Sequence, residues 1–424
     1  MVERVRGWRG PRRGVAAIVC ASLALGTGCF DTVSLGEGNS TGQGGEGGRP
    51  FLDPWVIPPA DTGDITGGDP CHPGLTTDLD GDGYTPTQGD CNDCDPSVGP
   101  DAVEMPTLLG DSPKDEDCNG LVDEPVPACD AGLSPGETSA LAAARAIDLC
   151  QVAHEGRWGV MSAVWVLPDG GTPPTTLAYE LGHGILDGFG PNVPVRHGAR
   201  LLALSTGTAR QPTDPGYQDP RGFDKGFVTT SPDGFPTTTT ACPGVEPGPP
   251  HDSVALELSV RAPGNARGFA FDFDFYTSEL PERMCSRYSD LFVTLLDPPP
   301  AGRADGNIAF DRLGNVVTVN GVQFEVCGCA GGPPCGAQGR ELACSLGASQ
   351  LVGTGFGGDT SHDGDHGATG WLTSETPIEP GSTFRLRFTI HDAEDGMLDS
   401  TILLDHFRWT RPDSQIPRKH LPRN

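Results

Sequence analysis

The chain has 424 residues, enough for two or three domains, and a formal net charge of −29 at pH 7. So strong a negative charge argues against nucleic acid and anionic lipid surfaces as partners, and it favours cations, above all Ca²⁺. Hydrophobic residues make up only 36%, beside 61 Gly and 41 Pro, so part of the chain is expected to be linker and not packed core.

The first 28 residues have the pattern of an export signal. A basic start precedes an apolar run, Val15 to Gly26, that is too short to span a bilayer. Small residues before Cys29 resemble a bacterial lipobox, in which the cysteine is acylated, whereas Cys20 lies inside the apolar run and is a poorer acceptor. Acyl chains at Cys29 would anchor the protein to a membrane, at the outer membrane or the cell surface. Cleavage without acylation would instead give free secretion.

Residues 29–68 are rich in Gly, Ser, Thr, Pro and Asp and lack periodicity, which predicts a flexible tether. Besides Cys20 and Cys29 the chain has twelve cysteines, six from Cys71 to Cys150 and six from Cys242 to Cys344. Two even groups in an exported chain predict disulfides within each region, without fixing which pairs form. Zinc at Cys91 and Cys94 is the weaker interpretation, because neither a second such pair nor a well-spaced His accompanies them.

Residues 69–130 form an acidic, cysteine-rich module with two loops suited to calcium. In the first, Asp78, Asp80 and Asp82 stand at positions 1, 3 and 5, a glycine follows at 6, and Tyr84 offers its carbonyl at 7. A tight loop of this pattern wraps Ca²⁺, a hard ion that takes six to eight oxygens. Asp90 lies close after it and is a further candidate ligand.

The second loop repeats the pattern about forty residues later. Its candidate ligands are Asp115, Asp117, Asn119, Leu121 (through its carbonyl), Asp123 and Glu124. Neither loop is a complete EF-hand, because the flanking helical patterns are missing. The loops therefore indicate a helix-free calcium module, and solvated acidic turns are the alternative.

The whole acidic stretch resembles the MopE-type metal-binding repeat of bacterial surface proteins. The matching segments are residues 80–84, 89–93, 95–96 and 117–124. The chain departs from that repeat by adding Cys94 and by having Asp101 and Ala102 where Gly and Ala are usual. The resemblance implies metal binding and no reaction.

Residues 131–155 predict a short helical connector. Ser134 and Glu137 have the spacing of a capping box with Pro135 in the first turn, and the helix would continue from Ala140 to Val152.

Residues 156–411 have the pattern of an all-β domain. Phe269, Phe271, Phe273 and Phe275 alternate with acidic and small residues, so one face of a strand would be buried while its carboxylates face out. Further strands are expected at 159–167, 201–206, 254–260, 291–296, 316–319, 322–326, 383–391 and 401–409. This pattern predicts an antiparallel β-sandwich or jelly roll, followed by a basic tail at 412–424. The stretches 207–250 and 328–370 would be long excursions.

The same domain resembles the choice-of-anchor L domain over roughly residues 156–411. The matching blocks are residues 188–190, 204–207, 271–290, 306–310, 317–320 and 390–400. Leu280 stands where a Glu is usual. The resemblance implies an extracellular β-domain, anchored here by the lipid at Cys29.

Polar groups near the predicted strand ends suggest further sites. Asp392, Asp395 and Asp399 would give a second Ca²⁺ site if they met Glu279, Asp290 and Asn307, and otherwise they are turn-formers. His362 and His366 flank an acidic, glycine-containing segment that suggests a transition-metal site or a solvated loop.

No catalytic residues are predicted. Asp272 and Asp274 would point the same way, roughly 7 Å apart, which suits a paired-carboxylate hydrolase, but no Gly-x-Ser-x-Gly motif is present. The sequence favours a non-catalytic binding or adhesion module at the cell surface, with calcium stiffening the stalk. Its ligand would be an extracellular glycan or protein. A carbohydrate-active hydrolase and a purely structural surface component are the alternatives.

Overall fold

The computed structural model describes residue 71 and residues 75–107, 110–154, 156–328, 335–337, 339–357 and 366–411. All of them belong to one unit, Ile65–Asn424. The predicted export signal, Cys29, the predicted tether, the segment 362–365 and the predicted basic tail lie outside the described residues. Within the described ranges, no helix is long and apolar enough to cross a membrane.

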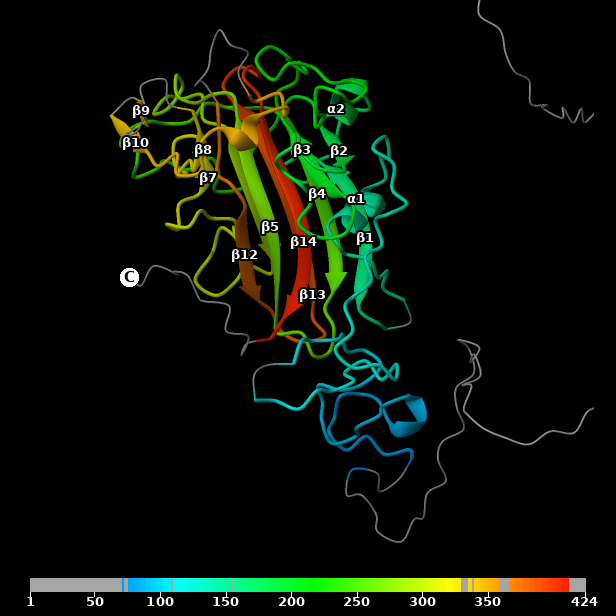
Figure 1. Ribbon diagram of the computed structural model, residues 1–424. Coiled ribbons are helices and arrows are strands. Elements are labelled where there is room, and N and C mark those ends of the chain that lie inside the picture. The colour runs from blue at the N-terminus through cyan, green and yellow to red at the C-terminus, as the bar shows by residue number, and fades with distance from the viewer. Residues whose placement is uncertain are drawn as a thin grey trace, which may run out of the picture. The chain divides into compact units, whose positions relative to one another are not determined.

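Two antiparallel sheets form the body of the molecule (Figure 1). The first has the order β1 (Gly159–Val166), β4 (Pro250–Arg261), β13 (Thr383–Ala393), β6 (Leu291–Asp297), β7 (Val317–Thr318). The second has the order β2 (His183–Leu186), β3 (Leu201–Ser205), β14 (Ser400–Thr410), β5 (Gly268–Thr277), β11 (Gly367–Ala368), β8 (Val326–Cys327), and β12 (Leu372–Pro377) also pairs with β5. The predicted all-β sandwich is confirmed.

The remaining elements are short. They are η1 (Pro86–Gln88), α1 (Ala140–Ala146), α2 (Leu177–Leu181), the hairpin of β9 (Cys335–Ala337) and β10 (Arg340–Leu342), and η2 (Ser349–Leu351).

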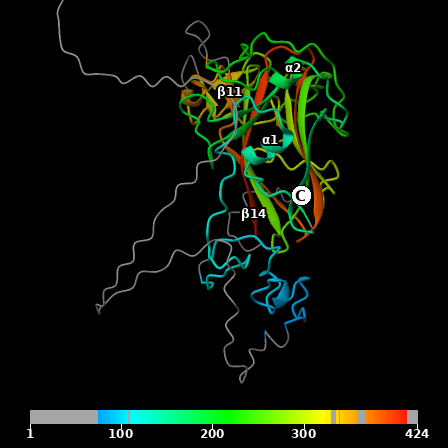
Figure 2. The same cartoon turned by 90° about the vertical axis from the view of Figure 1, so that its right-hand side faces the viewer.

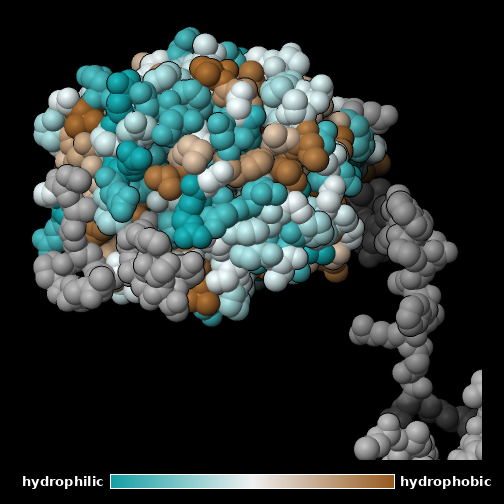
Figure 3. Space-filling model, turned by 90° about the horizontal axis from the view of Figure 1, so that it is seen from above, coloured by the Kyte–Doolittle hydropathy of each residue, from teal (hydrophilic) through white to brown (hydrophobic). Residues whose placement is uncertain are grey.

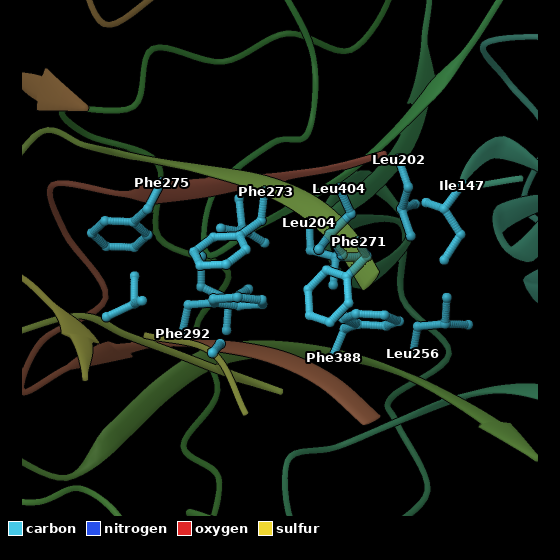
Figure 4. Packing of buried hydrophobic residues seen from close by; sticks show 14 of the residues in the cluster. Ile147, Leu202, Leu204, Leu256, Phe271, Phe273, Phe275, Phe292, Phe388 and Leu404 are labelled. Carbon is cyan, nitrogen blue, oxygen red and sulfur yellow. The ribbon is translucent and has the colours of Figure 1, made fainter. Parts of the chain in front are cut away.

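The core between the sheets is aromatic. Phe271 and Phe273 point from β5 toward Phe388 of β13 and Phe292 of β6 on the opposite sheet (Figure 4). The ring centroids of Phe271 and Phe388 lie 5.2 Å apart, edge to face. The alternation of β5 thus places its rings inward, as a two-residue period requires.

The outer face of β5 is also buried, which corrects the prediction that its carboxylates face water. All residues of the strand are buried, Asp272 and Asp274 included. A second apolar layer covers this face, in which Phe189 and Phe356 pack against Tyr276 of β5. Both rings come from segments outside the sandwich strands. The two-residue period of β5 therefore identified one buried face of the strand, but it could not show that the opposite face is buried as well.

The predicted helix is shorter than expected. Ser139, not Ser134, caps α1, accepting a hydrogen bond from the amide of Ala142 at 3.4 Å. Ser134 instead accepts from the Gly136 amide in a preceding turn, because Pro135 and Gly136 are poor helix formers beyond a first turn. The alanines of α1 join the sandwich core, and Figure 2 shows the helix against the sheets.

Five disulfides join described cysteines, and each stays within its predicted region. The pairs are Cys71–Cys94, Cys91–Cys118, Cys129–Cys150, Cys242–Cys285 and Cys327–Cys344. Since Cys91 and Cys94 belong to different disulfides, they do not form a zinc pair.

Candidate functional site

The first acidic loop is shaped by its own aspartates. Asp78 accepts hydrogen bonds from the amides of Gly81 at 2.7 Å and Gly83 at 3.1 Å. Asp82 accepts from the Tyr84 amide at 2.7 Å. Both glycines have positive φ, of 80° and 99°, which other residues rarely adopt. The loop therefore turns tightly around one oxygen-rich centre.

Two overlapping groups of carboxylates gather at that centre. Oxygens of Asp78, Asp80 and Asp93 lie within 4.8 Å of one another, and so do oxygens of Asp80, Asp82 and Asp90. One oxygen each of Asp80, Asp90 and Asp93 is buried without a hydrogen-bond partner. Asp93 is 0% exposed and was not among the predicted ligands. Asp93 ends the segment 89–93, which matches the metal-binding repeat, and that match could have identified it as a ligand.

Burial and the crowding of like charges raise pKa values in this group. Burial, and then the charges of neighbouring aspartates, raise the pKa of Asp82 to about 6, against a lowering by the Tyr84 amide. Burial likewise raises the pKa of Asp90, with Asp80 and Asp93 adding to the effect. A cation among these oxygens would remove that repulsion.

The second loop brings only part of its predicted set together. Oxygens of Asp117 and Glu124 meet those of Glu104 within 4.8 Å. Asp115 instead caps the loop, accepting from the amides of Asn119 at 3.0 Å and Gly120 at 2.9 Å. One buried oxygen of Glu124 has no hydrogen-bond partner.

Glu104 organises this second group and was missed from the sequence. Its carboxylate accepts from the amides of Glu116 and Asp123, each at 2.8 Å. Asp123 turns away toward the amide and hydroxyl of Thr107. Glu104 precedes the loop by eleven residues and has no motif of its own, so spacing within the loop could not identify it. Leu121 enters the loop through its amide, which donates to Asn119.

The acidic module also contacts the sandwich. The amide and carbonyl of Val103 bond to the side chain of Asn265, which lies between β4 and β5. Asp101 accepts from the Trp158 amide at 2.9 Å, and Arg411 pairs with Glu116. The contacts couple the second loop to the last described residues of the chain.

The predicted sandwich acids divide into buried and exposed members. Asp392 and Asp399 are buried, whereas Asp395 is exposed and accepts from the Met397 amide, as a turn-former does. Asn307 is buried with its carbonyl accepting from Thr294 and Ala309, so its polar group is used structurally. His366 is buried at the edge of the segment 358–365, whose other predicted ligand, His362, is outside the described residues.

Asp272 and Asp274 share a strand face but have opposite electrostatics. Asp272 is paired with Arg196, His406 and Arg408, and its hydrogen bonds and these charges hold its pKa well below the usual range despite burial. Burial raises the pKa of Asp274 to about 7, although the Thr369 hydroxyl donates to it at 3.1 Å. Both are covered, so neither is presented openly to a substrate.

A β-bulge in β14 creates the cationic layer above Asp272. The pairing of β14 with β5 shifts between Asp405 and Arg408. The extra residue, His406, has φ of 54° and lies with Arg408 beside Asp272, as bulges re-aim side chains. Arg196 is 45% exposed and its guanidinium lies 5.7 Å from the ring centre of Trp371. His197 stacks on His406 at 5.3 Å.

The model of the Choice-of-anchor L domain family matches residues 186–407, just over half of the chain. The chain belongs to the Choice-of-anchor L family. The match runs from Leu186, at the end of β2, to Phe407 in β14, so it holds the sandwich acids and the bulge. The acidic module lies outside it.

No curated protein sequence matches this Choice-of-anchor L protein. Among solved structures, it is similar to TmCBM61 in complex with β-1,4-galactotriose, at 9% sequence identity and a TM-score of 0.19. That match covers 54% of this chain and 82% of the other. So low a TM-score carries no argument about function. The family itself indicates a surface-associated module.

Proposed function

We propose that this chain is an exported, lipid-anchored surface protein whose sandwich binds an extracellular ligand and whose acidic module is stiffened by Ca²⁺. The observation that carries the calcium claim is the set of buried carboxylate oxygens without partners in the first loop, on Asp80, Asp90 and Asp93. Buried ionised groups are ordinarily paired or bound to a metal.

The donor set suits calcium better than a softer ion. Every gathered side chain in the two loops offers carboxylate oxygen, and Ca²⁺ takes six to eight oxygens in flexible geometry. The described cysteines of the module are in disulfides and so offer no thiolate. The ions would add stability that the module's small apolar cluster, Val103 and Met105 against Ala266, does not supply.

Native mass spectrometry of the oxidised chain, residues 30–424, tests the calcium claim. Asp80 contributes to both groups of the first loop, so Asp80→Asn should lose at least one ion and lower the Tm in calcium but not in chelator. Asp111→Asn is the matched control, because Asp111 is an exposed acid of the same module outside these groups. Equal ion counts in the wild type and Asp80→Asn would refute the first-loop site.

For the ligand, the exposed layer over Asp272 offers the most specific chemistry. Arg196 and Arg408 are held by the buried Asp272 carboxylate, so their planar donors are fixed in position, and Trp371 supplies an aromatic face beside them. Cations and an aromatic ring on a strongly acidic protein suit an acidic glycan, with stacking for the sugar and guanidinium pairing for its carboxylate. A protein ligand is the other class.

An array of acidic and neutral glycans tests that ligand class. Arg196→Gln with Arg408→Gln should abolish retention of acidic glycans while the fold persists. Arg385→Gln is the control, because Arg385 is an exposed arginine on β13 paired with Asp297. Binding unchanged by the double substitution would exclude this face. Glycan turnover lost in Asp272→Asn would favour the hydrolase alternative, and self-assembly without a soluble ligand would favour the structural one.

The anchor is tested by labelling with a fatty acid in cells. Cys29→Ser should abolish the label and release the protein from membranes, whereas Cys20→Ser should do neither. Label retained in Cys29→Ser would contradict the proposed anchor.

A further inference from the structure

Five strands meet at one end of the sandwich and bring buried acids from both sheets together there. Glu279 lies two residues beyond β5, Asp290 immediately precedes β6, Asp392 lies near the end of β13, and Asp399 immediately precedes β14. β4 begins at the same end, the upper one in Figure 1. Each of the four carboxylates is 0 or 1% exposed.

Backbone contacts link the four acids to one another. Asp290 accepts from the Ala393 amide, next to Asp392, at 3.1 Å, and its own amide donates to Glu279 at 3.4 Å. The carbonyl of Asp399 accepts from the Ser278 amide, next to Glu279, at 3.1 Å. The acids therefore share one small region, although up to 120 positions separate them in the chain.

Hydrogen bonds satisfy these carboxylates only in part. Both oxygens of Asp392 are buried without a partner, and so is one oxygen each of Glu279, Asp290 and Asp399. The Gly396 amide and the Ser400 hydroxyl lie near enough to lower the pKa of Asp392 and Asp290 without forming a well-aligned hydrogen bond. An ionised carboxylate in such a place is costly unless a charge compensates it.

The nearby lysine compensates only part of this charge. The Nζ of Lys225 donates to the carbonyls of Ser205 at 2.7 Å and Asp252 at 3.0 Å. The Asp252 carboxylate in turn accepts from the amides of Lys225 and Phe227. Lys225 lowers the pKa of Asp399, yet burial and the neighbouring acids leave that pKa well above its ordinary value. Lys225 thus acts on Asp252, Asp392 and Asp399, and its single charge offsets only part of theirs.

We propose that Glu279, Asp290, Asp392 and Asp399 hold a buried Ca²⁺ that joins the two sheets at this end of the sandwich. The set offers only carboxylate oxygen, which selects a hard divalent cation. Glu279 and Asp399 flank strands of one sheet, and Asp290 and Asp392 belong to the other. The ion would act as a staple between layers that are otherwise held by aromatic packing.

Binding at this site requires some closure. Each group in the acidic module brings three ligand oxygens within 4.8 Å, and the sandwich acids form no such group among the described residues. The turn between Asp392 and Asp399 carries exposed residues, Asp395 and Met397, and can adjust. Figure 3 views the molecule from this end and shows a mostly hydrophilic surface with scattered hydrophobic residues.

The test separates this site from the acidic module. In a chain with Asp80→Asn and Glu104→Gln, which disable all three carboxylate groups of the module, native mass spectrometry in CaCl₂ should still find one tightly held ion. Adding Asp392→Asn should remove it, with at least a tenfold loss of calcium affinity. Adding Glu375→Gln, at an exposed position of β12 outside this cluster, should not. No retained ion in the module-disabled chain would overturn the proposal and leave the module's own calcium sites untouched.

Thermal melting at pH 8 gives a second readout in the otherwise wild-type chain. In chelator, Asp392→Asn should melt at or above the wild-type temperature because it removes a repelling charge, and in calcium it should melt below it. A rise in both conditions would show carboxylates that share protons and bind no ion, which overturns the proposal. If Asp392→Asn does not fold, Glu279→Gln takes its place with the same expected reversal.

Discussion

The acidic module and the end of the sandwich both concentrate carboxylates, but they hold them differently. In the module, backbone amides a few residues away hold acids such as Asp78 and Asp115 in local loops. In the sandwich, Glu279 and Asp392 come from strands far apart in the chain and lie in the protein interior. Local loops can preorganise an ion site without a core, whereas the sandwich acids depend on the whole fold to meet.

The difference also decides what each region contributes to stability. The module has a small apolar cluster and two disulfides across its loops, while the sandwich has an aromatic core that spans both sheets. Removing charge compensation should therefore loosen the module locally. In the sandwich it should lower the stability of the whole domain.

The largest expected effect breaks the module without the sandwich. Cys91→Ser with Cys118→Ser removes the crosslink between the two loops, which should cost about 3 kcal/mol of module stability. Limited proteolysis should then cut within residues 75–124 while the sandwich keeps its melting transition. Concerted loss of both regions would show that the contacts at Asn265 and Trp158 make them one cooperative unit.

A second effect compares two acids of one strand face. Asp272→Asn removes the partner of Arg196, His406 and Arg408 and should destabilise the sandwich by about 2 kcal/mol, since those cations are partly exposed. Asp274→Asn is the matched control and should cost about 1 kcal/mol or less at pH 6, because the pKa of Asp274 is raised to about 7 and the group is already neutral there. Urea denaturation of both variants measures the difference, and equal costs would contradict it.

Strands with strict alternation could be predicted from sequence, and shorter ones could not. The ranges expected for β4, β5, β13 and β14 match the structure closely because each buries one regular face in the core. β11 and β12 were missed, since two to six residues with mixed polarity carry little periodic signal. The segment 322–326 was predicted as a strand, and only Val326 enters one, β8.

Site residues, like strands, could be predicted only where a regular local pattern in the sequence reveals them. Asp80 and Asp82 could be predicted because their spacing within one loop fixes their proximity. Glu104 could not, because a chain reversal brings it to Asp117 and Glu124. Glu279 and Asp290 were noted near strand ends, yet only the pairing of the sheets shows that they are buried at the same end of the sandwich as Asp392, whereas Asp395 is exposed.

A pH series sharpens the comparison between the regions. Burial raises the pKa of Asp290 to about 8 and raises the pKa of Glu279, Asp392 and Asp399 above their ordinary values. The folded chain then keeps protons that the unfolded chain loses above about pH 4. Stability in chelator should be fully present below that pH and fall as pH rises through about 8, by about 1.4 kcal/mol per pH unit for each proton.

Melting temperatures in chelator from pH 5 to 8.5 check this slope. Glu279→Gln, which cannot ionise, should flatten it, whereas Glu375→Gln, at an exposed position of β12, should leave it unchanged. A melting temperature that rises with pH over this range would show that the sandwich acids are compensated within the protein itself.

The smallest expected effect lies at the acid that organises the second loop. Glu104→Gln keeps one carbonyl oxygen but loses the carboxylate that receives the amides of Glu116 and Asp123, at a cost of about 1 kcal/mol. Hydrogen exchange should quicken at those two amides and not in the first loop, while Glu375→Gln, on an exposed position of β12, should change neither. Exchange that quickens equally in both loops would mean that the Cys91–Cys118 crosslink makes the two loops a single unit. The two loops of the module would then respond to a substitution together, and the module would be less local in its stability than the comparison with the sandwich implies.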